Sequence, residues 1–73
     1  MEVSMEYYKI VVWMNSPADG SAVCDGVTYS TMLPRVGEYI KWNGDCCAVT
    51  KIVYDYDDAD EERAVNIYVV PAS

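Results

Sequence analysis

The sequence predicts an all-β fold, a small antiparallel barrel or curled sheet of five or six strands. Apolar residues recur with a period of two along most of the chain, which is the spacing of a strand and not of a helix. Val, Ile, Tyr and Trp are frequent within these runs, and such residues favour strands. Asp-Gly and Asn-Gly pairs stand between runs, and both pairs suit tight hairpin turns. At 73 residues the chain is expected to form one domain, residues 1–73.

The first expected strand covers Tyr7 to Met14 and is apolar on both faces. One face carries alternate residues from Tyr8 to Met14, and the other carries Tyr7, Val11 and Trp13, interrupted only by Lys9. One face of each strand fills the core of a small barrel, so the second face should meet a partner or another copy of the chain. We therefore expect Tyr7, Val11 and Trp13 to bind a partner, with edge pairing of this strand in a homodimer as one arrangement. The alternatives are ordinary half-buried strand residues, or a hairpin that crosses this face.

The next two expected elements are hairpins. Ser21 to Met32 contains Asp25-Gly26 between two short β-prone runs, which predicts a two-residue turn there. Asn43-Gly44 joins Glu38–Trp42 to Asp45–Tyr54, and a two-residue loop fixes the register. It places Trp42 opposite Asp45, Lys41 opposite Cys46, Ile40 opposite Cys47 and Glu38 opposite Val49.

Strict alternation along the second hairpin would turn Lys51 into the core, which is costly for an unpaired charge. A β-bulge near Thr50-Lys51 would instead return Ile52 and Tyr54 to the core face. The last expected strand is Ala64–Val70, ended by Pro71. Its inward residues are Val65, Ile67 and Val69, and its outward residues are Asn66, Tyr68 and Val70.

The central part of the chain resembles small SH3-like barrels of the Tudor and KOW kind. The stretch from Leu33 to Ile40, the Asn43-Gly44 turn and the stretch from Ala48 to Asp55 are similar to their V-G-E/D-x-I/V strand, tight turn and bent return strand. The resemblance covers about 40 of the 73 residues and implies a fold, not a function. KOW modules that touch RNA are usually basic, whereas this chain is acidic.

Charge limits the classes of function. Twelve acidic residues stand against five basic ones, so the net charge is −7, and histidine is absent. Direct nucleic-acid binding is therefore not expected. Neither is a histidine base or metal ligand. The longest apolar run, Ile10 to Met14, is too short for a membrane span, and the N-terminus lacks the apolar stretch of a secretory signal.

The cysteines favour a reducing compartment. Cys24, Cys46 and Cys47 are odd in number and form no C-x-x-C pair. Adjacent Cys46 and Cys47 would point to opposite faces of a strand and could not share one metal. We expect free thiols, no metal, no cofactor, no catalytic site and a cytoplasmic location.

The loop at residues 55–63 concentrates half of the acidic residues. Its candidates for binding a basic protein partner are Asp55, Asp57, Asp58, Asp60, Glu61 and Glu62. Closely spaced carboxylates can imitate a row of phosphates and be attracted to a cationic groove. An EF-hand begun at Asp55 fails, because Ala59, Asp60 and Asn66 stand at positions that need oxygen, glycine and glutamate. A looser divalent-ion site and a merely solvated loop are the alternatives.

These features together predict a non-catalytic, acidic protein-binding module. Its size, acidity and cysteine usage are similar to those of small phage-encoded inhibitors such as anti-CRISPR proteins. That likeness implies a phage or mobile-element inhibitor of a host nucleic-acid-binding or defence complex, acting in the host cytoplasm. The alternatives are an oligomeric structural or accessory barrel and a small-ligand or divalent-ion binder.

Overall fold

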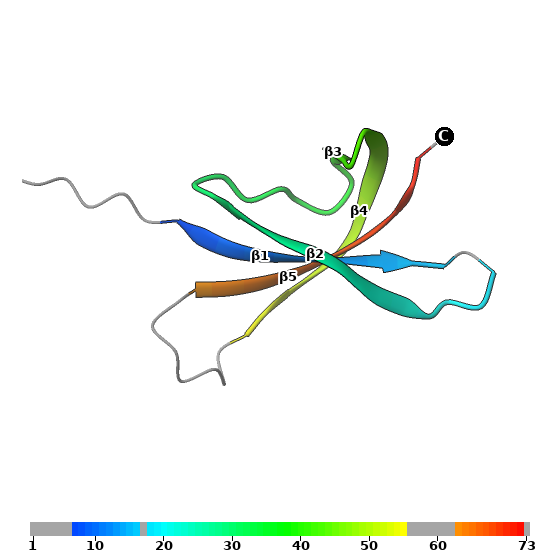
Figure 1. Ribbon diagram of the computed structural model, residues 1–73, viewed down its shortest axis with the longest axis horizontal. Helices are drawn as coiled ribbons and strands as arrows, with labels where there is room; N and C mark the ends of the chain where they lie inside the picture. The colour runs from blue at the N-terminus through cyan, green and yellow to red at the C-terminus, as the bar shows by residue number, and fades with distance from the viewer. Residues whose placement is uncertain (1–6, 17, 56–62, 73) are drawn as a thin grey trace, which may run out of the picture.

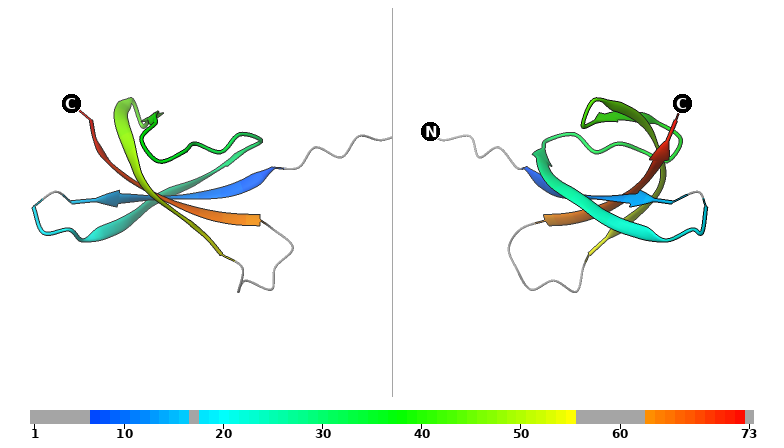
Figure 2. Two further views of the ribbon diagram at one scale, coloured as in Figure 1. Left: turned by 180° about the vertical axis from the view of Figure 1, so that it is seen from behind. Right: turned by 45° about the vertical axis from the view of Figure 1, so that its right-hand side comes forward.

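The computed structural model describes residues 7–16, 18–55 and 63–72, and these residues form five strands and no helix. The strands are β1 (Tyr8–Asn15), β2 (Ala22–Ser30), β3 (Tyr39–Trp42), β4 (Asp45–Tyr54) and β5 (Arg63–Pro71). They make one sheet in the order β2-β1-β5-β4-β3, which curls into a half-barrel (Figures 1 and 2). The all-β, curled-sheet prediction is thereby confirmed.

Strand direction differs from the prediction in one place, because β1 and β5 are parallel and the sheet is therefore mixed. The other three pairings, β1–β2, β3–β4 and β4–β5, are antiparallel as expected. The parallel pair places the longest apolar run of the chain, Ile10 to Met14 in β1, beside β5 at the middle of the sheet. It places β1 between two partners, so β1 has no free edge.

The core lies on the concave side, here called the inner face. β3 and the segment that links it to β2 lie over this face (Figure 1). The buried side chains are Ile10, Val12, Cys47, Val49, Val65, Ile67 and Val69. They come from the three central strands, where alternate residues point to the same side. The predicted inward set of the last strand is confirmed.

The second hairpin follows its prediction closely. The Asn43-Gly44 turn has positive φ at both residues, 52° and 86°, as a type I′ turn requires. Trp42 pairs with Asp45, Lys41 with Cys46 and Ile40 with Cys47, and the Val49 N–H donates to the Glu38 carbonyl at 2.9 Å.

The predicted bulge in β4 is also present. Val49 pairs with Val69 and Lys51 pairs with Tyr68, so Thr50 is the extra residue. Its hydroxyl donates to the Tyr68 carbonyl at 3.1 Å. Ile52 thereby returns to the inner face and packs against the core, whereas Tyr54 remains 48% exposed. The bulge adds twist to β4 and helps the sheet to curl.

The predicted turn at Asp25-Gly26 is wrong, because β2 runs through it as one strand from Ala22 to Ser30. The pairing with β1 shifts here, so that Val12 lies opposite Gly26 and Trp13 opposite Cys24. Asp25 is thus the extra residue of a bulge. Asp-Gly suits a bulge as well as a turn, and each of the two expected arms had only three residues.

Candidate functional site

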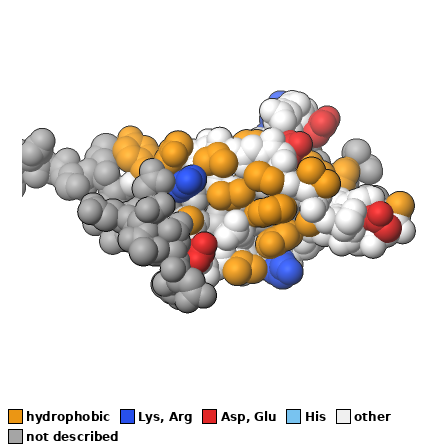
Figure 3. Space-filling model, turned by 60° about the horizontal axis from the view of Figure 1, so that its bottom comes forward, with side chains coloured by type: hydrophobic (Ala, Val, Ile, Leu, Met, Phe, Trp, Pro, Cys, Tyr) orange, Lys and Arg blue, Asp and Glu red, His pale blue; other side chains and the backbone are white. Residues whose placement is uncertain are grey.

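The convex side of the sheet, here called the outer face, has no described element over it. Cross-strand pairing assigns residues of four strands to it. They include Lys9, Val11, Trp13, Val27, Tyr29, Lys51, Val53, Asn66, Tyr68 and Val70. Hydrophobic side chains form a band across this face, with basic and acidic side chains around it (Figure 3).

Four side chains at the middle of the outer face contact one another, and we call them the aromatic centre: Trp13, Lys51, Asn66 and Tyr68. The Trp13 and Tyr68 rings stack with centroids 5.8 Å apart and an interplanar angle of 16°. The Trp13 indole N–H donates to the Asn66 side-chain oxygen at 2.9 Å. The Lys51 Nζ lies 4.4 Å from the centre of the Tyr68 ring, within the range of a cation–π contact. The rings are therefore held in place before any partner arrives.

The structure brings together two of the three predicted residues of the first strand. Val11 and Trp13 are half-buried on the outer face, and Tyr7 is 53% exposed just before β1. Edge pairing of β1 between two copies is excluded, because β2 and β5 already occupy both of its edges. The alternative of a crossing hairpin is wrong as well, since β2 pairs beside β1 and leaves its outer face open.

Tyr68, Asn66 and Lys51 are site residues that the sequence analysis did not assign. The outward orientation of Asn66 and Tyr68 was expected from the alternation of the last strand. Their contact with Trp13 depends on the parallel pairing of Trp13 with Tyr68 across β1 and β5. No local pattern encodes a pairing between strands so far apart in the sequence.

Of the predicted acidic residues, Asp55 is exposed beyond the end of β4, and its N–H donates to the Ala64 carbonyl at 3.2 Å. Asp57, Asp58, Asp60, Glu61 and Glu62 lie outside the described residues. The strand ends that flank this stretch are fixed, because Tyr54 pairs with Val65 and Tyr8 with Arg63. The acidic stretch is thus attached at the end of the sheet where β1 begins.

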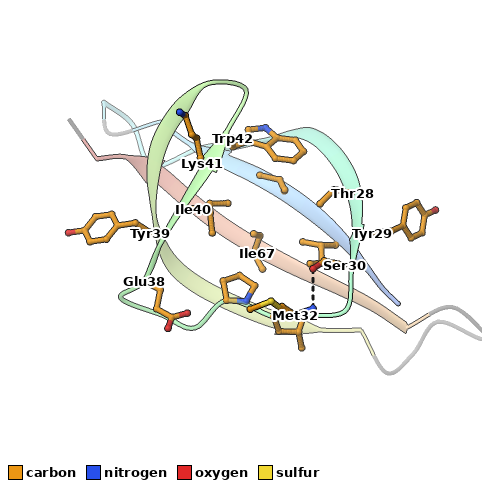
Figure 4. A pocket seen from close by; sticks show the side chains of 14 residues that line it. Thr28, Tyr29, Ser30, Met32, Glu38, Tyr39, Ile40, Lys41, Trp42 and Ile67 are labelled. Carbon is orange, nitrogen blue, oxygen red and sulfur yellow. Dashed lines mark hydrogen bonds between the residues drawn. The ribbon is translucent and has the colours of Figure 1, made fainter. Parts of the chain in front are cut away.

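A second surface feature is a cleft on the inner side, between the edge strands β2 and β3 (Figure 4). Its volume is about 540 Å³. Core side chains of β1 and β5 make its floor, β2 and β3 make two walls, and residues 32–34 close one end. The sequence analysis kept a small-ligand binder as an alternative.

The three thiols differ in environment. Cys24 and Cys46 are exposed and Cys47 is buried, so Cys46 and Cys47 point to opposite sides as expected. Burial raises the pKa of the Cys47 thiol, and the nearby Asp45 carboxylate acts in the same direction. Within the described ranges, no three residues of the types that ligate metals come together.

We expect two thiols of the native protein to react within minutes with a disulfide reagent such as dithionitrobenzoate. Cys47 should react only after unfolding, because it is inaccessible and its raised pKa disfavours the reactive thiolate. The Cys24→Ser variant serves as the control and should lose one of the two fast equivalents. A mass two daltons low, a zinc adduct or three fast thiols in the native protein would contradict this expectation.

Comparisons with protein-family models, curated proteins and solved structures gave no match. The described part of the chain holds no helix with the length and hydrophobicity needed to cross a bilayer.

Proposed function

We propose that this protein is a non-catalytic binding module that docks on a basic protein through the outer face of its half-barrel, which we take to be SH3-like. The aromatic centre is the observation that carries this proposal. Trp and Tyr dominate the energetics of protein interfaces, since each combines a large apolar area with a polar tip. Here both rings sit side by side on a face that no described residue covers.

Pre-organisation favours a docking role for these rings. Ordering a mobile side chain at an interface costs about 0.5–1.5 kcal/mol. Stacking, the hydrogen bond to Asn66 and the Lys51 contact already fix the two rings in the free protein. More of the contact energy is then available for binding.

Charge indicates the kind of partner. The net charge is −7, and the apolar outer face carries Lys9 and Lys51 on its strands, with Asp55 just beyond the end of β4. Most of the acidic excess is in the stretch attached at one end of the sheet. A partner with a basic surface could contact the apolar face while its cations interact with that end, and long-range attraction would speed the encounter. The same charge disfavours direct contact with nucleic acid or with an anionic membrane.

We further propose that the basic partner normally binds nucleic acid. A basic groove that normally holds nucleic acid would accept a row of carboxylates in place of phosphates. The protein would then act in the cytoplasm of a host cell as an inhibitor encoded by a phage or mobile element. What supports this step is the density of acidic residues between Asp55 and Glu62, together with the small size of the chain.

Photo-crosslinking tests this function in the cells in which the gene occurs. Val53 on the outer face, 42% exposed, is replaced by p-benzoylphenylalanine. In the matched control the same residue replaces Val36, which is 61% exposed in the segment that lies over the inner face. We expect one discrete heteromeric adduct from position 53 and none from position 36. Because salt screens exposed charges, the yield of this adduct should fall when irradiation is repeated in cell extract at about 0.5 M instead of 0.1 M salt.

Three results would contradict the proposal. Equal adducts from both positions would show that the contact is not specific to the outer face. An adduct whose yield does not depend on salt would show that charge does not contribute to the binding. An adduct of twice the 8.2 kDa mass would favour the oligomeric alternative.

A further inference from the structure

The cleft between β2 and β3 is enclosed on four sides, as Figure 4 shows. Thr28 and Ser30 stand on the β2 wall, and Ile40 stands on the β3 wall. Trp42 covers one end, and Met32 with its neighbours covers the other. The space is therefore a bowl and not a channel, so an extended peptide could not pass along it.

The Trp42 end of the bowl is built by contacts between the two edge strands. The Trp42 indole N–H donates to the Asp25 carboxylate at 2.6 Å, and the Asn43 amide donates to the same oxygen at 3.1 Å. Hydrogen bonds to a charged acceptor are the stronger kind. Gly26 lets the ring approach, since a Cβ at this position would lie 2.9 Å from the indole. The bulge at Asp25 thus fixes the end wall of the cleft.

The inside of the bowl is apolar, with hydroxyl groups on one wall. Ile67 lies in the floor, and Ile40 points inward (Figure 4). Thr28 and Ser30 present hydroxyls. The Ser30 oxygen accepts the Met32 N–H at 3.0 Å, so its own proton can be donated to a ligand.

The charged groups of the cleft stand at its rim. Glu38 and Lys41 point away from the middle of the bowl (Figure 4), and the Glu38 carboxylate accepts the Arg35 N–H at 2.8 Å. A charged ligand would therefore lose its hydration without gaining a counter-ion inside. The interior selects against both signs of charge.

We infer that this cleft binds a compact, neutral small molecule with an apolar body and one hydrogen-bonding group. Its volume of about 540 Å³ lies within the roughly 300–1,000 Å³ of small-molecule sites, which often occupy the mouths of β-barrels. The apolar body would contact Ile40, Trp42 and Met32, and the polar group would face Thr28 and Ser30. This site is independent of the outer face and of the function proposed for it.

Amide spectra of the ¹⁵N-labelled protein test the inference with defined probes. Cyclohexanol is compared with its charged analogues cyclohexylamine and cyclohexanecarboxylate. We expect cyclohexanol to give saturable shifts at Thr28–Ser30 and Tyr39–Trp42, with affinity at least tenfold above that of either analogue. Thr28→Val removes one hydroxyl at nearly constant shape and should weaken cyclohexanol about fivefold.

A pair of neighbouring substitutions separates the cleft from the outer face. Thr28→Phe fills the bowl and should abolish the shifts, whereas Val27→Phe, on the opposite side of the same strand, should leave them unchanged. Unsaturable shifts, equal binding of the charged analogues or full binding by Thr28→Phe would overturn the inference. Chemical shift changes in the cleft that appear only when the crosslinked protein partner is added would also overturn the inference. The occupant of the cleft would then be an apolar side chain of that partner.

Discussion

Replacement of Ile67 by alanine is expected to lower the free energy of unfolding by about 2–5 kcal/mol. Ile67 is 2% exposed at the centre of β5, and it pairs with Val12 on one side and Ile52 on the other. The neighbouring strands are held by their ladders and cannot close the space that the lost methylene groups leave. For 73 residues the whole stability is of the order of 4–11 kcal/mol, so the variant should lose about half of it.

Urea denaturation followed by tryptophan fluorescence measures this loss. Val36→Ala is the control, because its side chain is 61% exposed and its replacement should change stability by less than about 0.5 kcal/mol. A loss below about 1 kcal/mol for Ile67→Ala would mean that the sheet can collapse into the cavity. That result would contradict the packing of the half-barrel around the three central strands.

Local patterns predicted the parts of the fold that local forces decide. The Asn43-Gly44 turn sets the register of its hairpin, and Lys51 forces a bulge because its charge cannot enter the core. Alternation alone assigns Val65 and Ile67 to the inner face. In each case the residues that determine the local structure are close in the sequence, so a local pattern is enough to predict it.

Contacts between distant residues decide the remainder. Asp25-Gly26 carries the same signal for a turn and for a bulge, and the partner that favours the bulge is Trp42, 17 residues away. Period-two alternation shows which residues share a face but not whether neighbouring strands are parallel. The pairing of β1 with β5 was therefore not predictable, and with it the contact between Trp13 and Tyr68.

The two surfaces of the site were unequally predictable for the same reason. Trp13 could be proposed because its own strand is apolar on both faces. The cleft is made by the two edge strands of the sheet, which come together only through the curl of all five. Thr28 and Ile40 carry no local feature that marks them as facing one space.

Trp13→Ala is expected to weaken binding of the crosslinked partner by about 30-fold or more, which corresponds to at least about 2 kcal/mol. Trp13 contributes its own apolar area, and it also holds the Tyr68 ring and the Asn66 side chain in place. Its removal would thus weaken three contacts together. Calorimetry with the purified partner gives the affinity.

Controls on the same face and on the cleft locate the effect. Tyr29→Ala removes an exposed ring from the edge strand β2 and should cost less than threefold. Trp13→Phe keeps a ring for stacking but loses the hydrogen bond to Asn66, so it should fall between wild type and Trp13→Ala. Trp13 is not part of the buried core, and cyclohexanol should still bind the cleft of Trp13→Ala if the fold is intact.

A loss of affinity below threefold for Trp13→Ala would show that the aromatic centre only stabilises the sheet. Light scattering tests whether the outer face instead binds a second copy of the chain. In that case the wild type would have twice its 8.2 kDa mass, and the Trp13→Asp variant would have the mass of a monomer.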